Sequence, residues 1–236
     1  MSAEETTIRV NFGKPMPIFP LDSVSLLPQQ VLPLHVFEPR YRQMVEHALD
    51  GSGQIAMATF EGQKWKQEYH GRPPVREAVC IGQIVQHEKL PDGRYNILLQ
   101  GVCRARVVES MPPTGERLYR EARLEPIGER NDDEERLTPV RDRLRGMLTD
   151  GPLEDLTASS SILEVLSDEE IPTSAVLELV SFTVLTDPEV KYRLLEEGSP
   201  LVRAQIVFAE LDHLGQMIRQ ARPQRGGEPP RGCTWN

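Results

Sequence analysis

Two β-type runs joined by a short turn constrain the fold of this chain more than any other feature. The first run is VCIGQIVQHEKL, residues 79–90, and the second is YNILLQGVCRARVVES, residues 95–110. Between them lies PDGR, in which proline and glycine stand at positions that favour a tight chain reversal. Because only antiparallel neighbours can be joined by so short a turn, the two runs are expected to lie side by side in an antiparallel sheet.

The sequence on either side of this pair adds further β-type segments. Short β-type runs over residues 17–37 are interrupted by prolines, which are typical of strand edges, bulges and strand starts. Further strands are expected at residues 54–60 and 117–127, whereas residues 61–78 are polar and predict a long loop. The first half of the chain should therefore form an antiparallel sheet or a partly closed barrel.

The stretch VLPLHVFEPRY, residues 31–41, changes its apolar period from two to that of a helix. Aliphatic residues alternate in VLPLHVF, so a strand would place His35 on the opposite face. After Pro39, which suits a first helical position, apolar residues recur at helical spacing until the stop signal DGSG. A helix over about residues 39–50 is predicted, and the stretch is a joint between strand and helix.

The second half of the chain has helical patterns. It follows the acidic cluster DDEE at 132–135, which could bind a cation but lacks the spacing of a calcium loop and favours a linker or a helix N-terminus. Helix starts are indicated at Pro172, at DPE (187–189) and at SP (199–200). The expected organisation is a flexible tail over 1–14, a β lobe over 15–128, a helical-bundle lobe over 129–221 and a flexible tail over 222–236.

Composition excludes several classes of protein. The 236 residues carry a formal net charge of −9, which opposes non-specific attraction to nucleic acid. No run approaches the roughly 20 apolar residues of a membrane span, and the acidic start is not a signal peptide, so no membrane partner and a cytoplasmic location are expected. Three widely spaced cysteines without clustered histidines predict neither a disulfide framework nor a zinc site.

Motifs of catalysis are absent from the sequence. There is no phosphate-binding G-x-x-x-x-G-K-[ST], no G-x-G-x-x-G and no G-x-S-x-G, and HEKLP at 87–91 lacks the second histidine of H-E-x-x-H. Cys80 and Cys103 could act as nucleophiles beside a histidine, but their apolar surroundings favour small buried hydrophobes. We therefore expect no catalytic residue, no metal and no cofactor, and predict that the chain is not an enzyme.

A few side chains are candidates for binding. His35 could be a base or a ligand, but a histidine that is hydrogen-bonded at the strand–helix joint is favoured. Arg40 lies near a helix N-terminus, where it gains nothing from the helix dipole, and is expected to pair with a carboxylate or a chain end. Trp65 and Tyr69 on the long loop are more often packing residues than ligand anchors, although aromatics on loops commonly build binding sites.

The order of these segments resembles the N-terminal substrate-binding domain of the ATP-dependent Lon proteases. The resemblance rests on the opening PIFPL, on VLPLHVFEPRY running into a helix, on the IGQI strand, on LPDG followed by GVCRARV, and on RLEP before an all-helical segment. It covers roughly residues 16–220. It implies an α+β fold, with a PUA-like β pseudo-barrel that carries one helix and is followed by a C-terminal helical bundle.

The same resemblance implies the recognition of unfolded or tagged polypeptides, with no catalytic residue to carry over. Because the phosphate loop and the peptidase domain are missing, the chain looks like a stand-alone Lon-domain protein of the small bacterial type. We expect a non-catalytic module that binds unfolded or degron-bearing polypeptides at sheet edges and between the lobes, possibly with a separate ATPase or protease. The peptide-binding candidates are Phe37, Arg40, Tyr41, Trp65 and Tyr69.

Two other functions remain open at this point. PUA-like barrels elsewhere bind RNA, and a local patch of arginines could override the acidic net charge. A small hydrolase would need a pocket that combines Cys80 or Cys103 with a histidine. The arginines that would form the RNA-binding patch are Arg104, Arg106, Arg141, Arg143 and Arg145.

Overall fold

A computed structural model of the chain describes residues 8–62, 64–66, 73–128 and 134–225. Six strands lie in the described first half, within the ranges where the sequence predicts β structure. They are β1 (Met16–Leu21), β2 (Val31–Val36), β3 (Gln54–Thr59), β4 (Ala78–Lys89), β5 (Tyr95–Met111) and β6 (Glu121–Pro126).

Most of the described second half is helical, and the first half contains one α-helix. The strand–helix joint leads into a helix, and a short 3₁₀ helix, η1 (Lys64–Lys66), lies in the expected loop. The α-helices are α1 (Pro39–Leu49), α2 (Glu134–Thr149), α3 (Ser159–Ser167), α4 (Thr173–Thr183), α5 (Pro188–Glu196) and α6 (Pro200–Arg225).

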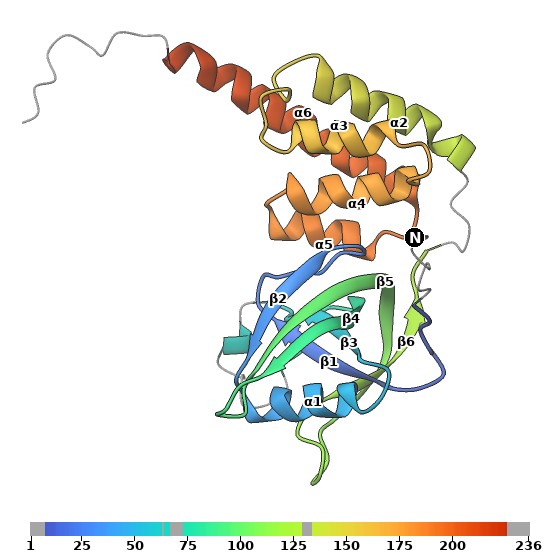
Figure 1. Cartoon of the computed structure of the whole chain (residues 1–236), viewed down its shortest axis with the longest axis vertical. Coiled ribbons are helices and arrows are strands. Elements are labelled where there is room, and N and C mark those ends of the chain that lie inside the picture. The colour runs from blue at the N-terminus through green and yellow to red at the C-terminus, as the bar shows by residue number, and fades with distance from the viewer. Residues whose placement is uncertain (1–7, 63, 67–72, 129–133, 226–236) are drawn as a thin grey trace, which may run out of the picture. The chain divides into compact units, whose positions relative to one another are not determined.

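Contacts group these elements into two compact units. One unit, called the barrel unit here, contains the six strands, α1 and α5, and the other, the bundle unit, contains α2, α3, α4 and α6. Helix α5 lies within the range 129–221 but packs against β4 and β5, and Figure 1 shows it at the end of the barrel opposite α1. The fold class is α+β, as the sequence predicts.

The strands close into a barrel because β5 pairs with three neighbours. The strand order is β2-β5-β4-β3-β1-β6, and β6 pairs again with β5. The N-terminal part of β5 pairs with β2, from Tyr95 to Gln100, and its C-terminal part pairs with β6, from Ala105 to Met111. β1 and β3 are parallel, and the other pairs are antiparallel.

Small side chains fill the interior of this barrel. Ala56 and Ala58 on β3, Ala105 on β5 and Ala122 on β6 are buried in one cluster with larger aliphatics such as Ile81. A barrel with so few strands leaves room for little more than side chains, so small residues on several strands allow the larger ones to fit between them. The described interior of the barrel is therefore filled by side chains.

A close crossing of the chain fixes the start of β2. The Gly101 N–H donates to the Gln30 carbonyl at 2.8 Å, and the Gln29 N–H donates to the Gly101 carbonyl at 2.9 Å. A Cβ atom at Gly101 would lie 2.1 Å from the Leu27 carbonyl oxygen, so only glycine allows this approach. The turn before β2 is thus held tightly against β5.

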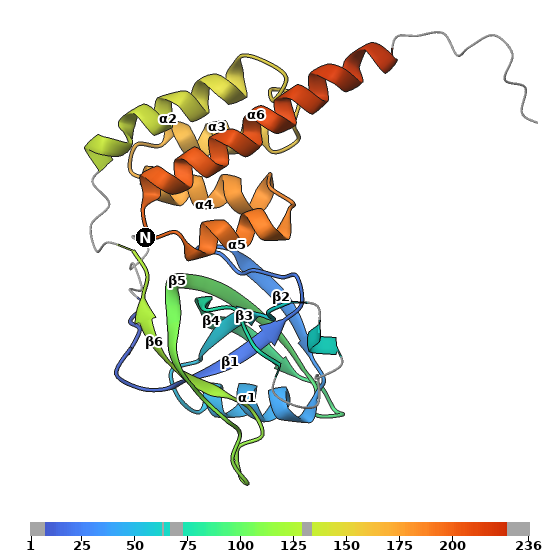
Figure 2. The same ribbon diagram turned by 180° about the vertical axis from the view of Figure 1, so that it is seen from behind.

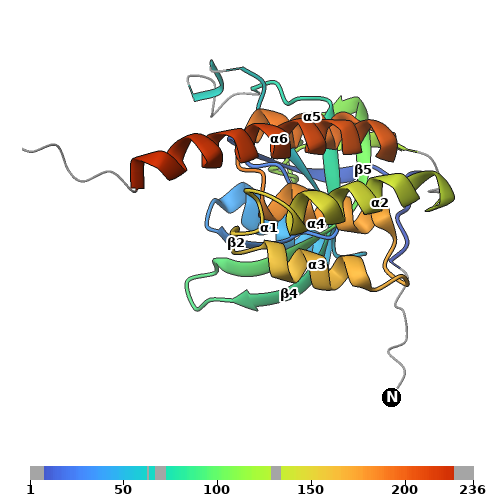
Figure 3. The same cartoon turned by 90° about the horizontal axis from the view of Figure 1, so that it is seen from above.

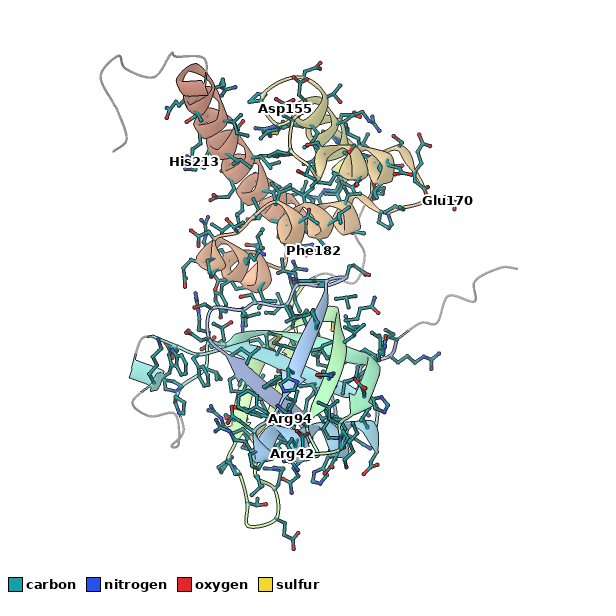
Figure 4. All side chains as sticks on the ribbon, turned by 60° about the vertical axis from the view of Figure 1, so that its left-hand side comes forward. Arg42, Arg94, Asp155, Glu170, Phe182 and His213 are labelled. Carbon is teal, nitrogen blue, oxygen red and sulfur yellow. The ribbon has the colours of Figure 1, made fainter. Side chains whose placement is uncertain are left out.

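The strand–helix joint has the predicted form. α1 begins at Pro39, ends at Leu49 and buries Tyr41, Met44 and Val45 against the barrel, which confirms the expected helix. The turn between β4 and β5 reaches the same end of the barrel, where Figure 4 shows Arg94 beside Arg42 of α1. α1 therefore covers this end of the barrel.

The four helices of the bundle unit pack around buried polar contacts as well as apolar ones. The Arg141 guanidinium of α2 is 8% exposed and donates to the carbonyl oxygens of Leu166 and Ile171, at 3.2 and 2.9 Å. Glu178 on α4 and Arg203 on α6 form an ion pair at 3.4 Å with side chains less than 10% exposed. The C-terminal part of α6 extends past the other three helices of its unit (Figure 2, Figure 3).

Candidate functional site

The barrel unit carries a cavity of about 1150 Å³ beside α5, called the α5 cavity here. It opens where the loop after β1, the end of β3, the segment around η1 and the start of β4 meet helix α5. All its lining residues belong to the barrel unit. They are Asp22, Ser23, Ser25, Thr59, Phe60, Glu61, Gly62, Trp65, Lys66, Val75, Arg76, Glu77, Pro188, Glu189, Tyr192 and Glu196.

Helix α5 is positioned in this wall by local and by long-range hydrogen bonds. Asp187 precedes the helix, and its carboxylate accepts the backbone N–H groups of Glu189 and Val190, which fixes the first turn. At the other end, Arg104 of β5 donates from Nε to the Leu194 carbonyl oxygen at 2.9 Å. The first turn is therefore fixed by a local cap and the last turn by a contact with the barrel, and the DPE start signal is confirmed.

Arg76 links the start of β4 to α5 in the cavity wall. Its guanidinium carbon lies 3.2 Å from the centroid of the Tyr192 ring, and its Nη1 donates to both carboxylate oxygens of Glu189 at 2.9 Å. The Tyr192 hydroxyl accepts the buried Ala78 N–H at 2.9 Å. Burial raises the pKa of this hydroxyl, so Tyr192 is neutral and an arginine is stacked on its ring.

An aromatic pair forms another part of the wall. The Phe60 and Trp65 rings stack with centroids 4.7 Å apart and planes 5° apart. Phe60 is buried, whereas Trp65 is partly exposed, and the Lys66 Nζ lies 5.6 Å from its ring centroid. The Trp65 ring thus gives the mouth of the cavity an apolar surface, and the Lys66 side chain beside it is charged.

A buried hydroxyl also lines the cavity. Ser25 is 7% exposed, and no described group forms a hydrogen bond with its side chain. Its hydroxyl oxygen is not among the fully buried unpaired atoms of the described residues, so it lies open to the cavity, where water can bind it. The Thr59 hydroxyl nearby does have a hydrogen-bond partner, because it donates to the Val24 carbonyl oxygen at 3.4 Å.

An exposed apolar surface lies on the outer side of β2 and its neighbours. Val31 and Phe37 are 48% and 60% exposed, and Val85 in the β4 bulge is 48% exposed. The register places Pro33 opposite Leu98 of β5, on the same outward side as Val31. We call this surface the β2 face; it consists of Val31, Pro33, His35, Phe37, Val85 and Leu98.

His35 lies on the β2 face and is hydrogen-bonded at the joint, as predicted. An arginine can only donate, so the contact of 3.2 Å from Arg94 makes His35 Nε2 an acceptor, and Nδ1 donates to Asn96 Oδ1 at 2.7 Å. The imidazole stacks with the Phe37 ring, with centroids 6.3 Å apart. Both ring nitrogens are thus engaged, and the histidine orients Phe37.

The five expected peptide-binding residues occupy different places. Phe37 is on the β2 face, and Trp65 lines the α5 cavity. Tyr41 is 5% exposed and packs on Phe19, while Arg40 pairs with Glu38 at 3.0 Å and lies over the Tyr41 ring. Tyr69 lies outside the described residues. Sequence reasoning did not identify Ser25, Phe60, Arg76 or Tyr192.

The arginines considered for RNA binding do not form one patch. Arg104 and Arg106 belong to the barrel unit and the other three to the bundle unit. Arg104 and Arg141 are buried and donate to backbone carbonyls. Arg143 pairs with Asp212 and Arg145 with Asp142, both at 3.3 Å. Four of the five are thus buried or paired with acids, and of the five only Arg106 is exposed without an ion pair to a described residue, which weakens the electrostatic basis for the RNA hypothesis.

Cys80 and Cys103 lack the properties of nucleophiles. Cys80 is fully buried, and burial raises the pKa of the Cys103 thiol to about 11. Such a thiol is almost wholly protonated at neutral pH. Within the described residues no three histidine, cysteine or acidic side chains are grouped to hold a metal ion. No described helix is both long and apolar enough to cross a membrane.

Comparison with known proteins identifies the family. A family model described as the ATP-dependent protease La (LON) substrate-binding domain matches residues 15–213. Lon protease of Escherichia coli strain K12 is 29% identical over 110 residues, which cover 45% of this chain and 13% of that protein. Lon protease of Rickettsia conorii is 23% identical over 206 residues, which cover 84% of this chain and 26% of that protein.

Solved structures show the same fold. The N-terminal domain of Mycobacterium avium complex Lon protease has a TM-score of 0.63 at 16% identity, covering 84% of this chain and 98% of that one. The Lon N-terminal domain protein from Xanthomonas campestris has a TM-score of 0.57 at 21% identity, covering 83% of this chain and 98% of that one. The chain belongs to the Lon substrate-binding domain family.

Proposed function

We propose that this chain is a non-catalytic module that binds unfolded or degron-bearing polypeptides in the cytoplasm and presents them to an ATPase and protease. The observation that carries the proposal is the β2 face. It exposes three large apolar side chains, Val31 on β2, Phe37 directly after β2 and Val85 on β4, and both strands pair with β5. Contiguous exposed apolar surface on a folded domain is typical of interaction sites.

The β2 face suits side-chain contacts better than the addition of a strand. Among the described strands, β2 pairs only with β5, so its second edge is open. However, Pro33 in its centre lacks an N–H group, and a proline on an edge strand blocks the continuous pairing of another chain. We therefore expect a client to be held mainly by its apolar side chains, in an extended form.

Phe37 is the central residue of this proposal. Its ring is 60% exposed and is oriented by the stacked His35, whose ring nitrogens are both hydrogen-bonded. A rigid exposed aromatic side chain offers a large contact area at a small loss of conformational entropy. Tyr41 and Arg40 support Phe37 indirectly, because their contacts with Phe19 and Glu38 fix the start of α1.

Fluorescence anisotropy with labelled, permanently unfolded polypeptides tests the proposal. The wild-type chain should bind with dissociation constants on the order of tens of μM, and the double variant Val31→Ser/Phe37→Ser should bind at least about fivefold more weakly. The matched control is Val108→Ser, which removes a valine that is 56% exposed on β5 outside the β2 face. A wild-type chain that binds no polypeptide, or a double variant that binds like wild type, would contradict the proposal.

A further inference from the structure

We propose that His35 is a pH-sensitive switch of the β2 face, which binds apolar clients while the imidazole is neutral and releases them when the imidazole takes up a proton. This inference rests on the proposed function and deepens it, since it names the regulation of the same site. Three observations carry it: the direction of the hydrogen bonds through His35, the charged groups around them, and the exposed apolar residues beside them.

The hydrogen bonds through His35 run in one direction. The Glu88 carboxylate accepts, so the Asn96 Nδ2 group donates to it at 3.1 Å and Asn96 Oδ1 faces the imidazole. His35 Nδ1 is therefore the donor to Asn96, at 2.7 Å. An arginine can only donate, so His35 Nε2 accepts from Arg94 Nη1 at 3.2 Å. The contacts on the two sides of the ring independently require the same neutral tautomer.

Protonation of His35 is incompatible with this arrangement. An imidazolium donates from both nitrogens, so its Nε2–H would point at the N–H groups of Arg94, and two like charges would be in contact. Either Arg94 leaves the imidazole, or the imidazole turns away from Asn96. Histidine is the side chain whose charge ordinarily changes between about pH 5 and pH 8. The pH in this range therefore decides whether the hydrogen bonds persist.

The charged groups that surround His35 keep their charge over the same range. In the turn between β4 and β5, Asp92 Oδ2 accepts from Arg94 Nε at 2.6 Å, and the hydrogen bond from the Arg94 backbone N–H lowers the pKa of the Asp92 carboxyl. Glu88 of β4 accepts at the far end of the hydrogen bonds, and Arg42 of α1 lies beside Arg94 (Figure 4). Carboxylates and guanidinium groups are ordinarily ionised above pH 5, so only the imidazole changes its charge.

The position of His35 couples its charge to client binding. Its ring stacks with Phe37, and Val31 and Pro33 are exposed on the same outward side of β2. An apolar client that covers these residues also covers the imidazole. Covering a neutral ring whose nitrogens are both hydrogen-bonded costs far less free energy than covering a charged ring that has lost a partner. Clients of the β2 face should therefore bind the neutral state.

Client binding at two pH values tests the switch. The probe is a fluorescently labelled, amidated peptide of apolar, serine and glycine residues, without histidine or acidic residues, so that its own charge is constant. The dissociation constant of the wild type, measured by anisotropy, should be at least about fivefold larger at pH 5 than at pH 7.5. In His35→Gln, whose amide stays neutral, the two constants should differ less than about twofold. An equal loss in both chains would overturn the switch.

His87→Gln is the matched control. His87 is exposed on β4 and lies opposite the buried Ile97 in the register, so its side chain is on the other side of the sheet from His35. This variant should keep the pH dependence of the wild type. A pH dependence that disappears in His87→Gln as well would show that it does not arise at His35, and would overturn the switch.

The tautomer of His35 provides a second measurement, which needs no client. Nitrogen NMR of the histidine rings distinguishes a proton on Nδ1 from one on Nε2, and the signals of His35 are identified by their absence in His35→Gln. At pH 7.5 the proton should be on Nδ1, because Asn96 accepts and Arg94 donates. A proton on Nε2 would overturn the inference.

These outcomes separate the switch from the proposed function. A wild-type chain that binds the peptide equally well at pH 5 and pH 7.5 overturns the switch but supports the proposed function. A wild-type chain that binds the peptide at neither pH contradicts the proposed function, and the switch with it.

Discussion

The guanidinium carbon of Arg76 lies 3.2 Å from the centroid of the Tyr192 ring, which joins the segment before β4 to helix α5. This contact accompanies a buried hydrogen bond from the Ala78 N–H to the Tyr192 hydroxyl. Together they explain why α5 belongs to the barrel unit although it follows three helices of the bundle unit, α2, α3 and α4, in the sequence. They also form one side of the α5 cavity.

Replacing Tyr192 by phenylalanine should destabilise the barrel unit. The substitution keeps the ring and its stacking with Arg76 but leaves the Ala78 N–H buried without an acceptor. A buried unsatisfied donor costs about 1–3 kcal/mol, so the free energy of unfolding should fall by that amount. Urea denaturation followed by circular dichroism measures it.

Tyr95→Phe is the matched control for this change. The Tyr95 hydroxyl donates to Glu46 Oε1 at 3.0 Å, and the Glu46 side chain is 45% exposed, so water can replace the lost donor. Its loss of stability should be less than half of that of Tyr192→Phe. Similar losses in the two variants would show that the buried Ala78 hydrogen bond contributes no more to stability than the hydrogen bond of Tyr95.

Gly101→Ala should prevent the close approach of the Leu27 turn to β5. The added Cβ atom would lie 2.1 Å from the Leu27 carbonyl oxygen, a backbone atom that cannot rotate away. We expect a loss of at least about 3 kcal/mol or failure to fold. Gly146→Ala in α2 is the control, because no atom lies within 4 Å of its Cβ position. It should stabilise the chain by about 0.5–1 kcal/mol.

Much of the fold is predictable because its signals are local. The period of two over residues 79–110, the PDGR turn, the proline that starts α1 and the DPE start of α5 each lie within a few residues of the structure they specify. The position of His35 follows from alternation in the same way. These features depend on backbone geometry and on nearest neighbours, which a single sequence contains.

The α5 cavity was not predictable for the opposite reason. Its wall combines Ser25, Trp65, Arg76 and Tyr192, which come from four separate segments and meet only after the barrel has closed and α5 has packed on it. Tyr192 lies on a helix whose pattern equally suits a bundle. Tyr41 was a binding candidate, although its helical spacing with Met44 and Val45 already placed it on the apolar face that packs against the barrel.

The buried ion pair of Glu178 and Arg203 in the bundle unit should be sensitive to removal of either partner. Both side chains are less than 10% exposed. Glu178→Leu leaves a buried guanidinium without its carboxylate and should cost about 3–5 kcal/mol of unfolding free energy. The double variant Glu178→Leu/Arg203→Met should recover most of this loss. Additive losses in the double variant, measured by denaturant titration, would contradict this expectation.

The Cys103 thiol should react slowly with alkylating reagents. Burial raises its pKa from 9.0 to about 11, so its thiolate fraction at pH 8 is roughly a hundredfold smaller than that of an unshifted thiol. In a Cys233→Ser variant, labelling by iodoacetamide followed by mass spectrometry should be slow in the folded chain and fast in urea. The rate should rise about tenfold per pH unit up to about pH 10. Rapid labelling at pH 7 would instead indicate an activated thiol.

Glu46 should titrate below its usual range. Hydrogen bonds from Lys89, at 2.7 Å, and from Tyr95 lower the pKa of this carboxyl from 4.5. Because the folded chain binds this proton less readily than the unfolded chain, the interaction stabilises the fold above pH 4.5. That contribution is lost as the pH falls through the folded-state pKa. Titration of the Glu46 carboxyl by NMR should therefore give a midpoint below 4.5.

The cause of this shift can be checked with a pair of lysine variants. Lys89→Met removes the largest source of the lowering and should move the Glu46 pKa back towards 4.5. Lys14→Met removes an exposed lysine that forms no ion pair with Glu46 and should leave the midpoint in place. Since both partners are about half exposed, high salt should also reduce the shift. A Glu46 midpoint that is unchanged in Lys89→Met would show that Lys89 does not cause the lowering.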